Sequence, residues 1–405
     1  MLCQWEVNLR MRSLSVVYKK RIALVVLIGL AVFLICLILF YPWDQEGVNI
    51  QGEESGKTQS YAEELMKTMS LKEKIYQMFI VSPEQITGVK RVTAAGSVTR
   101  EAINKYPVGG IIYSKPNMLS KEQIAEVISN IQSYSQTKLF IAVDEEGGKV
   151  NRLMDTVGTT LIDSMYSYRN KGEKTAKTNA HIIAGDIRSL GFNLDFAPVA
   201  DVWSNPDNTV IADRAYSDDF QTAAKLVCSA VEGFKEEGVL CTLKHFPGHG
   251  DTSEDSHTGM AYVNKTLEEL REEEFLPFRA GIDAGADFVM VGHLKANEID
   301  QEYPASLSEK IIGGIIRDEL GFEGIVITDS LQMSAITDNY TNAETAVLAV
   351  KAGNDILLEP EDLEEAVTAI EHAVSEGKIP EKCIDQHVER ILTTKITAGI
   401  IEKKG

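Results

Sequence analysis

Eight short apolar stretches, each followed by a helical pattern, recur along most of this 405-residue chain. Each stretch is rich in β-branched residues and ends in a polar residue before a turn; they cover 77–82, 109–115, 139–146, 192–201, 239–246, 286–293, 324–330 and 354–360. Amphipathic helical patterns lie between them, for example at 120–134, 222–238 and 267–285. Strands that alternate with helices in this way indicate a parallel sheet buried on both faces.

Eight strand–helix units are the number that closes a (β/α)8 barrel, and 345 residues follow the first sixty, which fits one barrel with insertions. An open, doubly wound sheet is the alternative fold. Its dinucleotide-binding form carries G-x-G-x-x-G after the first strand, and this chain has no such motif there. We therefore predict an α/β fold, a single (β/α)8 TIM-type barrel over 61–405.

The N-terminal sixty residues carry a different signal. Nineteen apolar residues run from Ile22 to Phe40 without a charge, and a helix of that length covers roughly 29 Å, the thickness of a bilayer core. Five basic residues precede the run, so the positive-inside rule places the N-terminus in the cytoplasm. We predict a basic cytoplasmic tail over 1–21, a transmembrane anchor over 22–41 and a flexible extracellular stalk over 42–60. A cleaved signal peptide is the alternative, but no A-x-A site follows.

Charge and cysteine content exclude several classes of function. The net charge of −20 makes the region after the anchor strongly acidic, which argues against nucleic acid as a partner. The five cysteines are widely spaced and form no C-x-x-C motif, so neither a disulfide framework nor a zinc ribbon is indicated. We expect no cofactor, and we expect the membrane to be a partner through the N-terminal helix.

Polar residues stand where the predicted strands end. In a (β/α)8 barrel, these carboxyl ends meet at one mouth, which carries the active site. Any one of these residues alone could cap a helix or face solvent, but several in register predict a shared site. The set comprises Asp144, Asp195, Asp201, Lys244, His245, His293 and Asp329.

Two segments of the chain carry candidate catalytic groups. Asp329 follows a buried β-branched run, so its carboxylate can be a nucleophile or a metal ligand, or it can simply cap the next helix. In KHFPGHGDTSEDSH (244–257), glycines and a proline after the strand predict a mobile loop. Asp255 and His257 lie two residues apart there and project to the same side in extended chain. The carboxylate can then orient the imidazole as an acid and base near neutral pH.

Metal and sugar chemistry are both possible at such a mouth. His245, His293 and a strand-end aspartate would suit zinc, but the first strand, QMFIVSPE, has no histidine and Lys244 adds positive charge. Sugar hydroxyls need many fixed donors and acceptors, and glycoside cleavage needs a nucleophile and a proton donor. The residues that suit sugar binding are Asp144, Arg152, Asp201, Arg214, Lys244 and His245.

Five motifs of the chain are VDEEGGKVNRL (143–153), GFNLDFAPVADV (191–202), IADRAYSDD (211–219), KHFPGHGDTSEDSH and GIVITDSLQM (324–333). Together they resemble glycoside hydrolase family 3, and most closely its β-N-acetylglucosaminidase branch, over roughly residues 60–400. The resemblance implies a (β/α)8 barrel, Asp329 as the nucleophile that forms a glycosyl-enzyme, and His257 as acid/base assisted by Asp255. It also implies sugar contacts from Asp144, Arg152, Arg214, Lys244, His245 and His293. The chain departs from the family pattern at Lys149, Asn151 and 294–300.

The resemblance leads us to expect a retaining exo-β-N-acetylglucosaminidase that removes terminal β-linked N-acetylhexosamine from peptidoglycan fragments without a cofactor. Its partner would be an N-acetylglucosamine-containing glycan or muropeptide. Within the family, a β-glucosidase, a β-xylosidase or an N-acetylglucosaminide phosphorylase is the alternative. Outside the family, the alternatives are a metal-dependent barrel hydrolase and a glycan-binding module.

Overall fold

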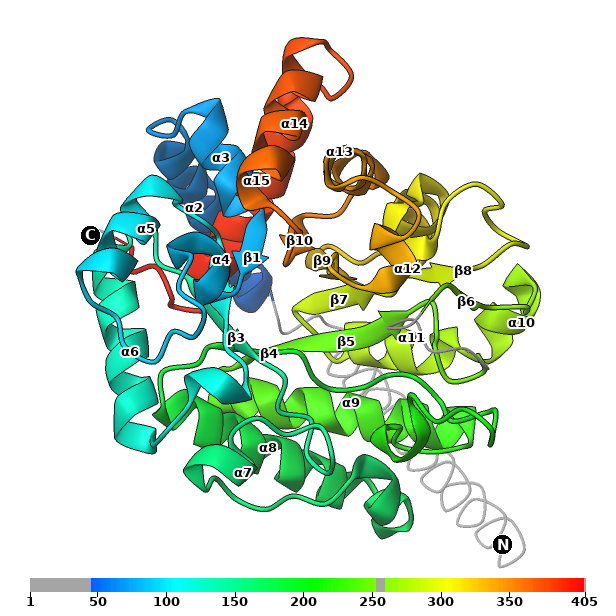
Figure 1. Cartoon of the computed structure of the whole chain (residues 1–405). Coiled ribbons are helices and arrows are strands. Elements are labelled where there is room, and N and C mark those ends of the chain that lie inside the picture. Colours follow the sequence, from blue (N-terminus) through cyan, green and yellow to red (C-terminus); the bar gives the residue numbers. More distant parts are fainter. Residues whose placement is uncertain (1–44, 253–258, 404–405) are drawn as a thin grey trace, which may run out of the picture. The chain divides into compact units, whose positions relative to one another are not determined.

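The computed structural model describes residues 45–252 and 259–403 (Figure 1). The expected tail (1–21) and membrane anchor (22–41) lie outside the described residues, and so do Asp255 and His257. Within the described ranges, no helix is both long and apolar enough to cross a membrane. The chain divides into two compact units, 1–57 and 58–405, and the second unit contains the barrel.

Eight parallel strands close into a barrel in the order β1, β2, β3, β4, β5, β7, β9, β10 (Figure 1). Each strand lies within one of the eight predicted ranges, so the predicted (β/α)8 barrel is confirmed. The closed ring excludes the open, doubly wound alternative. The strands are β1 (Phe79–Val81), β2 (Gly110–Ile112), β3 (Phe140–Val143), β4 (Leu194–Asp195), β5 (Leu240–Phe246), β7 (Phe288–Val291), β9 (Ile325–Ser330) and β10 (Ile356–Leu358), and a separate pair joins β6 (Ala261–Tyr262) to β8 (Leu294–Lys295).

Helices connect the strands on the outside of the barrel (Figure 1). Several begin at a Ser or Thr with Glu or Gln three residues later, the reciprocal capping box that satisfies free N–H groups; it is present at Ser70, Ser82, Thr266 and Thr341. The α-helices are α2 (Gln45–Met66), α3 (Leu71–Gln77), α4 (Pro83–Thr87), α5 (Ser97–Lys105), α6 (Lys121–Tyr134), α7 (Met154–Val157), α8 (Glu173–Ser189), α9 (Phe220–Glu237), α10 (Leu267–Glu272), α11 (Phe275–Asp283), α12 (Ser334–Thr337), α13 (Asn342–Ala352), α14 (Leu363–Ser375) and α15 (Glu381–Thr397). Short turns η1 (Lys115–Asn117), η2 (Met165–Lys171), η3 (Ala212–Arg214) and η4 (Ala305–Leu307) and the π-helical η5 (Lys310–Glu319) complete the connections.

Two segments differ from the expected pattern. The single helix expected over 267–285 is divided into α10 and α11. Pro277 explains the division, because a proline ring clashes with the carbonyl four residues earlier, here that of Glu273. Helix α2 covers most of the range 42–60, where we expect a flexible stalk. That range lacks proline after Pro42, and its three Gln and three Glu favour helix, although its three Gly do not.

Large aromatic side chains fill the barrel interior near the amino ends of its strands. Phe79, Phe140 and Phe288 begin β1, β3 and β7 and are fully buried. The rings of Phe140 and Phe288 meet edge to face, with their centroids 5.4 Å apart. Such a barrel is a packed core rather than a pore. Within the barrel, room for a ligand is therefore found at the opposite, carboxyl ends of the strands.

Candidate active site

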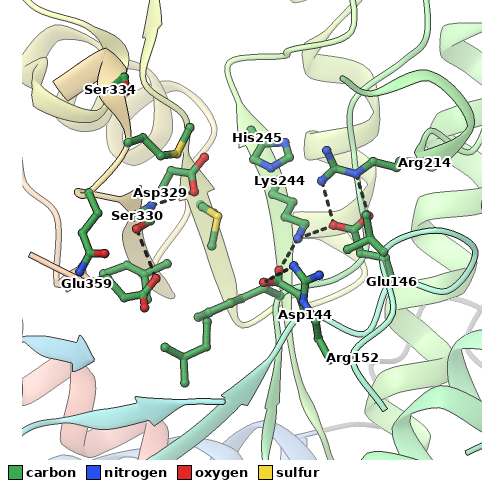
Figure 2. Close-up of a pocket in the computed structure, with 17 residues that line it drawn as sticks. Asp144, Glu146, Arg152, Arg214, Lys244, His245, Asp329, Ser330, Ser334 and Glu359 are labelled. Carbon is green, nitrogen blue, oxygen red and sulfur yellow. Dashed lines mark hydrogen bonds and ion pairs between the residues drawn. The ribbon is translucent and has the colours of Figure 1, made fainter. Parts of the chain in front are cut away.

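A cavity of about 450 Å³ lies at the carboxyl ends of the strands, within the range typical of small-molecule sites. Asp329, the expected nucleophile, lines it together with five of the six residues expected to contact sugar. Figure 2 shows this arrangement. The lining comprises Ile112, Asp144, Glu146, Val150, Arg152, Phe196, Arg214, Lys244, His245, Met290, Asp329, Ser330, Gln332, Met333, Ser334, Leu358 and Glu359.

A network of ion pairs forms one side of the cavity (Figure 2). Lys244 Nζ lies 2.8 Å from Asp144 Oδ1 and 2.6 Å from Glu146 Oε1. Arg214 binds Glu146 through both oxygens, at 2.9 Å from Nε and 2.8 Å from Nη2. Arg152 Nη2 approaches Asp144 Oδ2 at 3.6 Å. Side chains from three separate parts of the chain are thus held in fixed positions, with Asp144 at the cavity wall.

The network keeps its buried members charged. Burial would raise the pKa of Glu146, but the positive charges of Arg214 and Lys244 outweigh burial and lower this pKa below the usual glutamate range. Burial would lower the pKa of Lys244, yet Asp144 and Glu146 raise it above the usual lysine value. The side chains of Glu146 and Lys244 are 0% and 3% exposed, so these charges are little screened by solvent.

The segment after β3 forms a turn that is stabilised by hydrogen bonds to the side chain of Glu145. Glu145 Oε2 accepts hydrogen bonds from the backbone N–H groups of Arg152 and Leu153, at 2.5 and 2.9 Å. Gly148 has φ of +57°, and a Cβ there would lie 2.7 Å from Ser164 Cα. Only glycine fits this tight turn without strain. The turn returns the chain toward the cavity, which brings Arg152 beside Asp144.

His245 is oriented by a buried carboxylate. Asp201 Oδ2 lies 2.7 Å from His245 Nδ1, and Asp201 also accepts the backbone N–H groups of His245 and His249. Burial would raise the pKa of Asp201, but His245 lowers it below the usual aspartate value, so Asp201 is ionised. An ionised acceptor requires a proton on Nδ1, which leaves Nε2 as the free ring nitrogen for a ligand. Asp201 therefore positions His245 and does not itself line the cavity.

Asp329 and His293 both lie near the end of β9, but their environments differ. Asp329 is half-buried at the cavity, and its Oδ1 accepts the Ser330 backbone N–H at 2.8 Å. His293, expected to contact sugar, is instead fully buried outside the cavity lining. Its Nδ1 lies 2.7 Å from Ser306 Oγ and its Nε2 lies 2.9 Å from the Ser330 carbonyl oxygen. His293 thus contacts the strand end next to Asp329 through Nε2.

The loop after β5 is only partly described, because residues 253–258, including Asp255 and His257, lie outside the described residues. The first half of the loop, residues 247–252, is largely buried. Asn208 Nδ2 donates to the carbonyl oxygens of His249 and Thr252 at 2.8 and 2.9 Å. A Cβ at Gly250 would lie 1.6 Å from a backbone oxygen. Glycine at this position therefore allows close packing.

The sequence reasoning did not identify two acidic residues of the cavity, Glu146 and Glu359. Both follow predicted strands, which is the signal that identified Asp144 and Asp329. Glu146 is the last of three consecutive acids, and the strand-end pattern alone favours the first of them, Asp144. Glu359 ends the last apolar run, which we considered only as a strand.

The arrangement suits a polar, ring-shaped ligand. Positively and negatively charged side chains line one side of the cavity and provide fixed hydrogen-bond donors and acceptors. Phe196, Met290 and Leu358 contribute apolar surface to the lining. A half-buried carboxylate, Asp329, faces the same space. Sugar-cleaving sites combine these features, because hydroxyls require directed hydrogen bonds and the anomeric carbon requires a nearby carboxylate.

Comparison with known proteins agrees with this chemistry. The model of the glycosyl hydrolase family 3 N-terminal domain matches residues 70–394. A β-hexosaminidase from Xanthomonas oryzae is 33% identical over 288 residues, which cover 69% of this chain and 85% of that protein. β-Hexosaminidase A from Pseudoalteromonas piscicida is 35% identical over 280 residues, 64% of this chain but only 47% of that longer protein.

The solved structure of a family 3 β-N-acetylglucosaminidase from Paenibacillus superposes with a TM-score of 0.78 at 36% identity. The match covers 84% of this chain and 64% of that one. The barrel, the polar cavity and these relatives agree, and the protein belongs to glycosyl hydrolase family 3.

Proposed function

We propose that the protein is a retaining exo-β-N-acetylglucosaminidase that releases terminal β-linked N-acetylhexosamine. Family membership and the β-hexosaminidase relatives support a β-N-acetylhexosaminidase as the general activity. The single observation that carries the proposal is the position of Asp329, a half-buried strand-end carboxylate facing a cavity whose other side is a fixed polar network.

Each described residue has a defined role in this reaction. The Asp329 carboxylate attacks the anomeric carbon, and the bond to the leaving oxygen breaks as the glycosyl-enzyme ester forms. Asp144, Arg152 and Lys244 hold sugar hydroxyls on the other side of the cavity. Arg214 fixes Glu146, and Asp201 fixes His245, so these groups need little reorganisation when substrate binds.

The acid/base role is assigned to His257, with Asp255 orienting it. The imidazolium donates its proton to the leaving oxygen in the first step. The neutral imidazole then removes a proton from the water that hydrolyses the ester and restores Asp329. This assignment rests on the D-x-H pattern and on the family resemblance of its loop.

Peptidoglycan fragments outside the cell are the substrate that we propose. The apolar run from Ile22 to Phe40 and the basic residues before it support an N-terminal anchor with the barrel outside the membrane. Peptidoglycan carries β-linked N-acetylglucosamine and lies on that side of a bacterial membrane. The strongly acidic chain gives no support for nucleic acid as a partner.

Replacing His257 with alanine should slow cleavage of a natural disaccharide far more than cleavage of an aryl glycoside. A nitrophenolate leaves without protonation, whereas a sugar alkoxide does not, so the loss should be about 100-fold or more for the disaccharide and much smaller for the aryl glycoside. Steady-state kcat/KM on both substrates measures the difference. Equal losses on both would contradict the acid role, and Asp255→Asn should show the same pattern in weaker form.

A further inference from the structure

Glu359 enters the cavity through an unusual backbone conformation. It follows β10 directly, and its φ is +46°, in the left-handed region that residues other than glycine rarely adopt. Its backbone N–H donates to the Ile80 carbonyl oxygen at 2.9 Å, which holds this conformation at the strand end. Such conformations cost about 1 kcal/mol or more and concentrate at functional sites. Here the conformation is found at a residue that lines the cavity.

The contacts of Glu359 differ from those of the other acids in the wall. Its Oε2 accepts a hydrogen bond from Ser330 Oγ at 3.2 Å, and within the described part of the chain Oε1 makes no hydrogen bond. Asp144 and Glu146 are each paired with basic side chains. No basic side chain among the described residues lies within ion-pair distance, 4.0 Å, of Glu359. Figure 2 shows Glu359 with Ser330 on the side of the cavity away from Lys244 and Arg214.

The groups that face Glu359 are themselves acidic. Asp329 lies on β9, Asp144 follows β3 and Glu84 is on α4, and each of them disfavours a negative charge on Glu359. Burial is the largest influence, and together with these carboxylates it raises the pKa of Glu359 to about 7, although the Ser330 hydroxyl acts in the opposite direction. The geometry and the charges therefore favour a neutral carboxyl group, which can donate a hydrogen bond as well as accept one.

We propose that Glu359 is a substrate-binding residue whose neutral carboxyl donates a hydrogen bond to an uncharged oxygen of the sugar held beside Asp329. Ionisation removes that donor and places a second carboxylate next to the nucleophile. The proposal rests on the proposed glycosidase function and adds a specificity-determining contact to it. An acceptor oxygen, such as a hydroxyl or an amide carbonyl of the sugar, is the group it recognises.

The sign of the pH dependence follows from the form that binds. The neutral form is present below the pKa, so the sugar binds well at acidic pH and less well as pH rises through about 7. The protonated fraction of such a group falls from about 0.9 at pH 6 to about 0.1 at pH 8. Its contribution to kcat/KM should therefore decrease about 10-fold over this interval, and the change should fall mainly on KM.

The test uses the full chain in detergent and an N-acetylglucosaminide with a nitrophenol leaving group. Glu359→Gln keeps a neutral donor of the same shape at every pH. Glu359→Gly removes the side chain while tolerating φ of +46°. Glu361→Gln removes one charge from an exposed neighbour and serves as the matched control. The measured quantity is the ratio of kcat/KM in each variant to that in the wild type from pH 6 to pH 8, which cancels the titration of groups common to both.

At pH 6, Glu359→Gln should remain within about 3-fold of the wild type, and Glu359→Gly should be about 5-fold lower, as expected for one lost hydrogen bond. From pH 6 to pH 8, the ratio for Glu359→Gln should rise about 10-fold, while that for Glu361→Gln stays constant. A flat ratio for Glu359→Gln, or equal losses in the Gln and Gly variants at pH 6, would overturn the role of Glu359 alone. A wild-type chain without activity on the N-acetylglucosaminide would overturn the proposed function as well.

Discussion

Replacing Asp329 with alanine should reduce turnover by about 1,000-fold or more, because the variant lacks the carboxylate that forms the glycosyl-enzyme. The fold should survive, since Asp329 is half-buried and its described hydrogen bond goes to the adjacent backbone N–H. Steady-state kcat on the N-acetylglucosaminide and the thermal unfolding midpoint measure the two effects. Asp338→Ala, an exposed position in the same connection to β10, is the matched control.

Adding azide to the Asp329→Ala variant provides a second test of the nucleophile. The alanine variant has room for a small anion where the carboxylate stood, so azide should attack the anomeric carbon directly and restore part of the rate. One displacement inverts configuration, so the product should be the α-glycosyl azide, whereas two displacements in the wild type retain it. A variant that keeps most of its rate without azide would show that Asp329 is not the nucleophile.

Replacing Glu146 with alanine should damage both stability and activity. The change leaves Arg214 and Lys244 in a buried site with one carboxylate fewer, and breaking such a pair typically costs about 3–5 kcal/mol of unfolding free energy. Because Lys244 and Arg214 then lose their fixed positions, kcat/KM should fall about 100-fold or more. Denaturant unfolding and kinetics on the N-acetylglucosaminide check both effects.

An exposed ion pair provides the control for Glu146. Lys149 and Asp213 lie 2.7 Å apart, but their side chains are 51% and 42% exposed. Asp213→Ala should therefore change the free energy of unfolding by less than about 1 kcal/mol. Similar losses in Glu146→Ala and Asp213→Ala would contradict the claim that burial makes the Glu146 network rigid.

The strands were predictable because every barrel strand is buried on both sides, which leaves a continuous apolar run in the sequence. Once the strands are predicted, the positions of their carboxyl ends are known as well. These positions predict a shared site for Asp144, Lys244, His245 and Asp329. The ends of the helices were harder to predict from the sequence, since Pro277 interrupts an otherwise regular amphipathic pattern. Its effect depends on a single backbone carbonyl, which periodicity does not reveal.

The sequence could not predict which of the strand-end side chains line the cavity. His293 and His245 both stand at strand ends, yet only His245 is among the described residues that line the cavity, while His293 is fully buried. The glycines after β5 predict a mobile loop, and the sequence does not reveal that Gly250 packs closely against the Val202 backbone. Glu359 lines the cavity from a left-handed backbone conformation, which no local residue pattern predicts.

The most direct test of the central claim compares two substrates on the full chain. Release of nitrophenol from the β-N-acetylglucosaminide and from the β-glucoside would be followed side by side, with and without a chelator. We expect a strong preference for the N-acetyl sugar and no effect of the chelator. Preference for the glucoside would contradict the N-acetylglucosaminidase assignment, and loss of activity with the chelator would contradict catalysis by Asp329 and His257 without a metal.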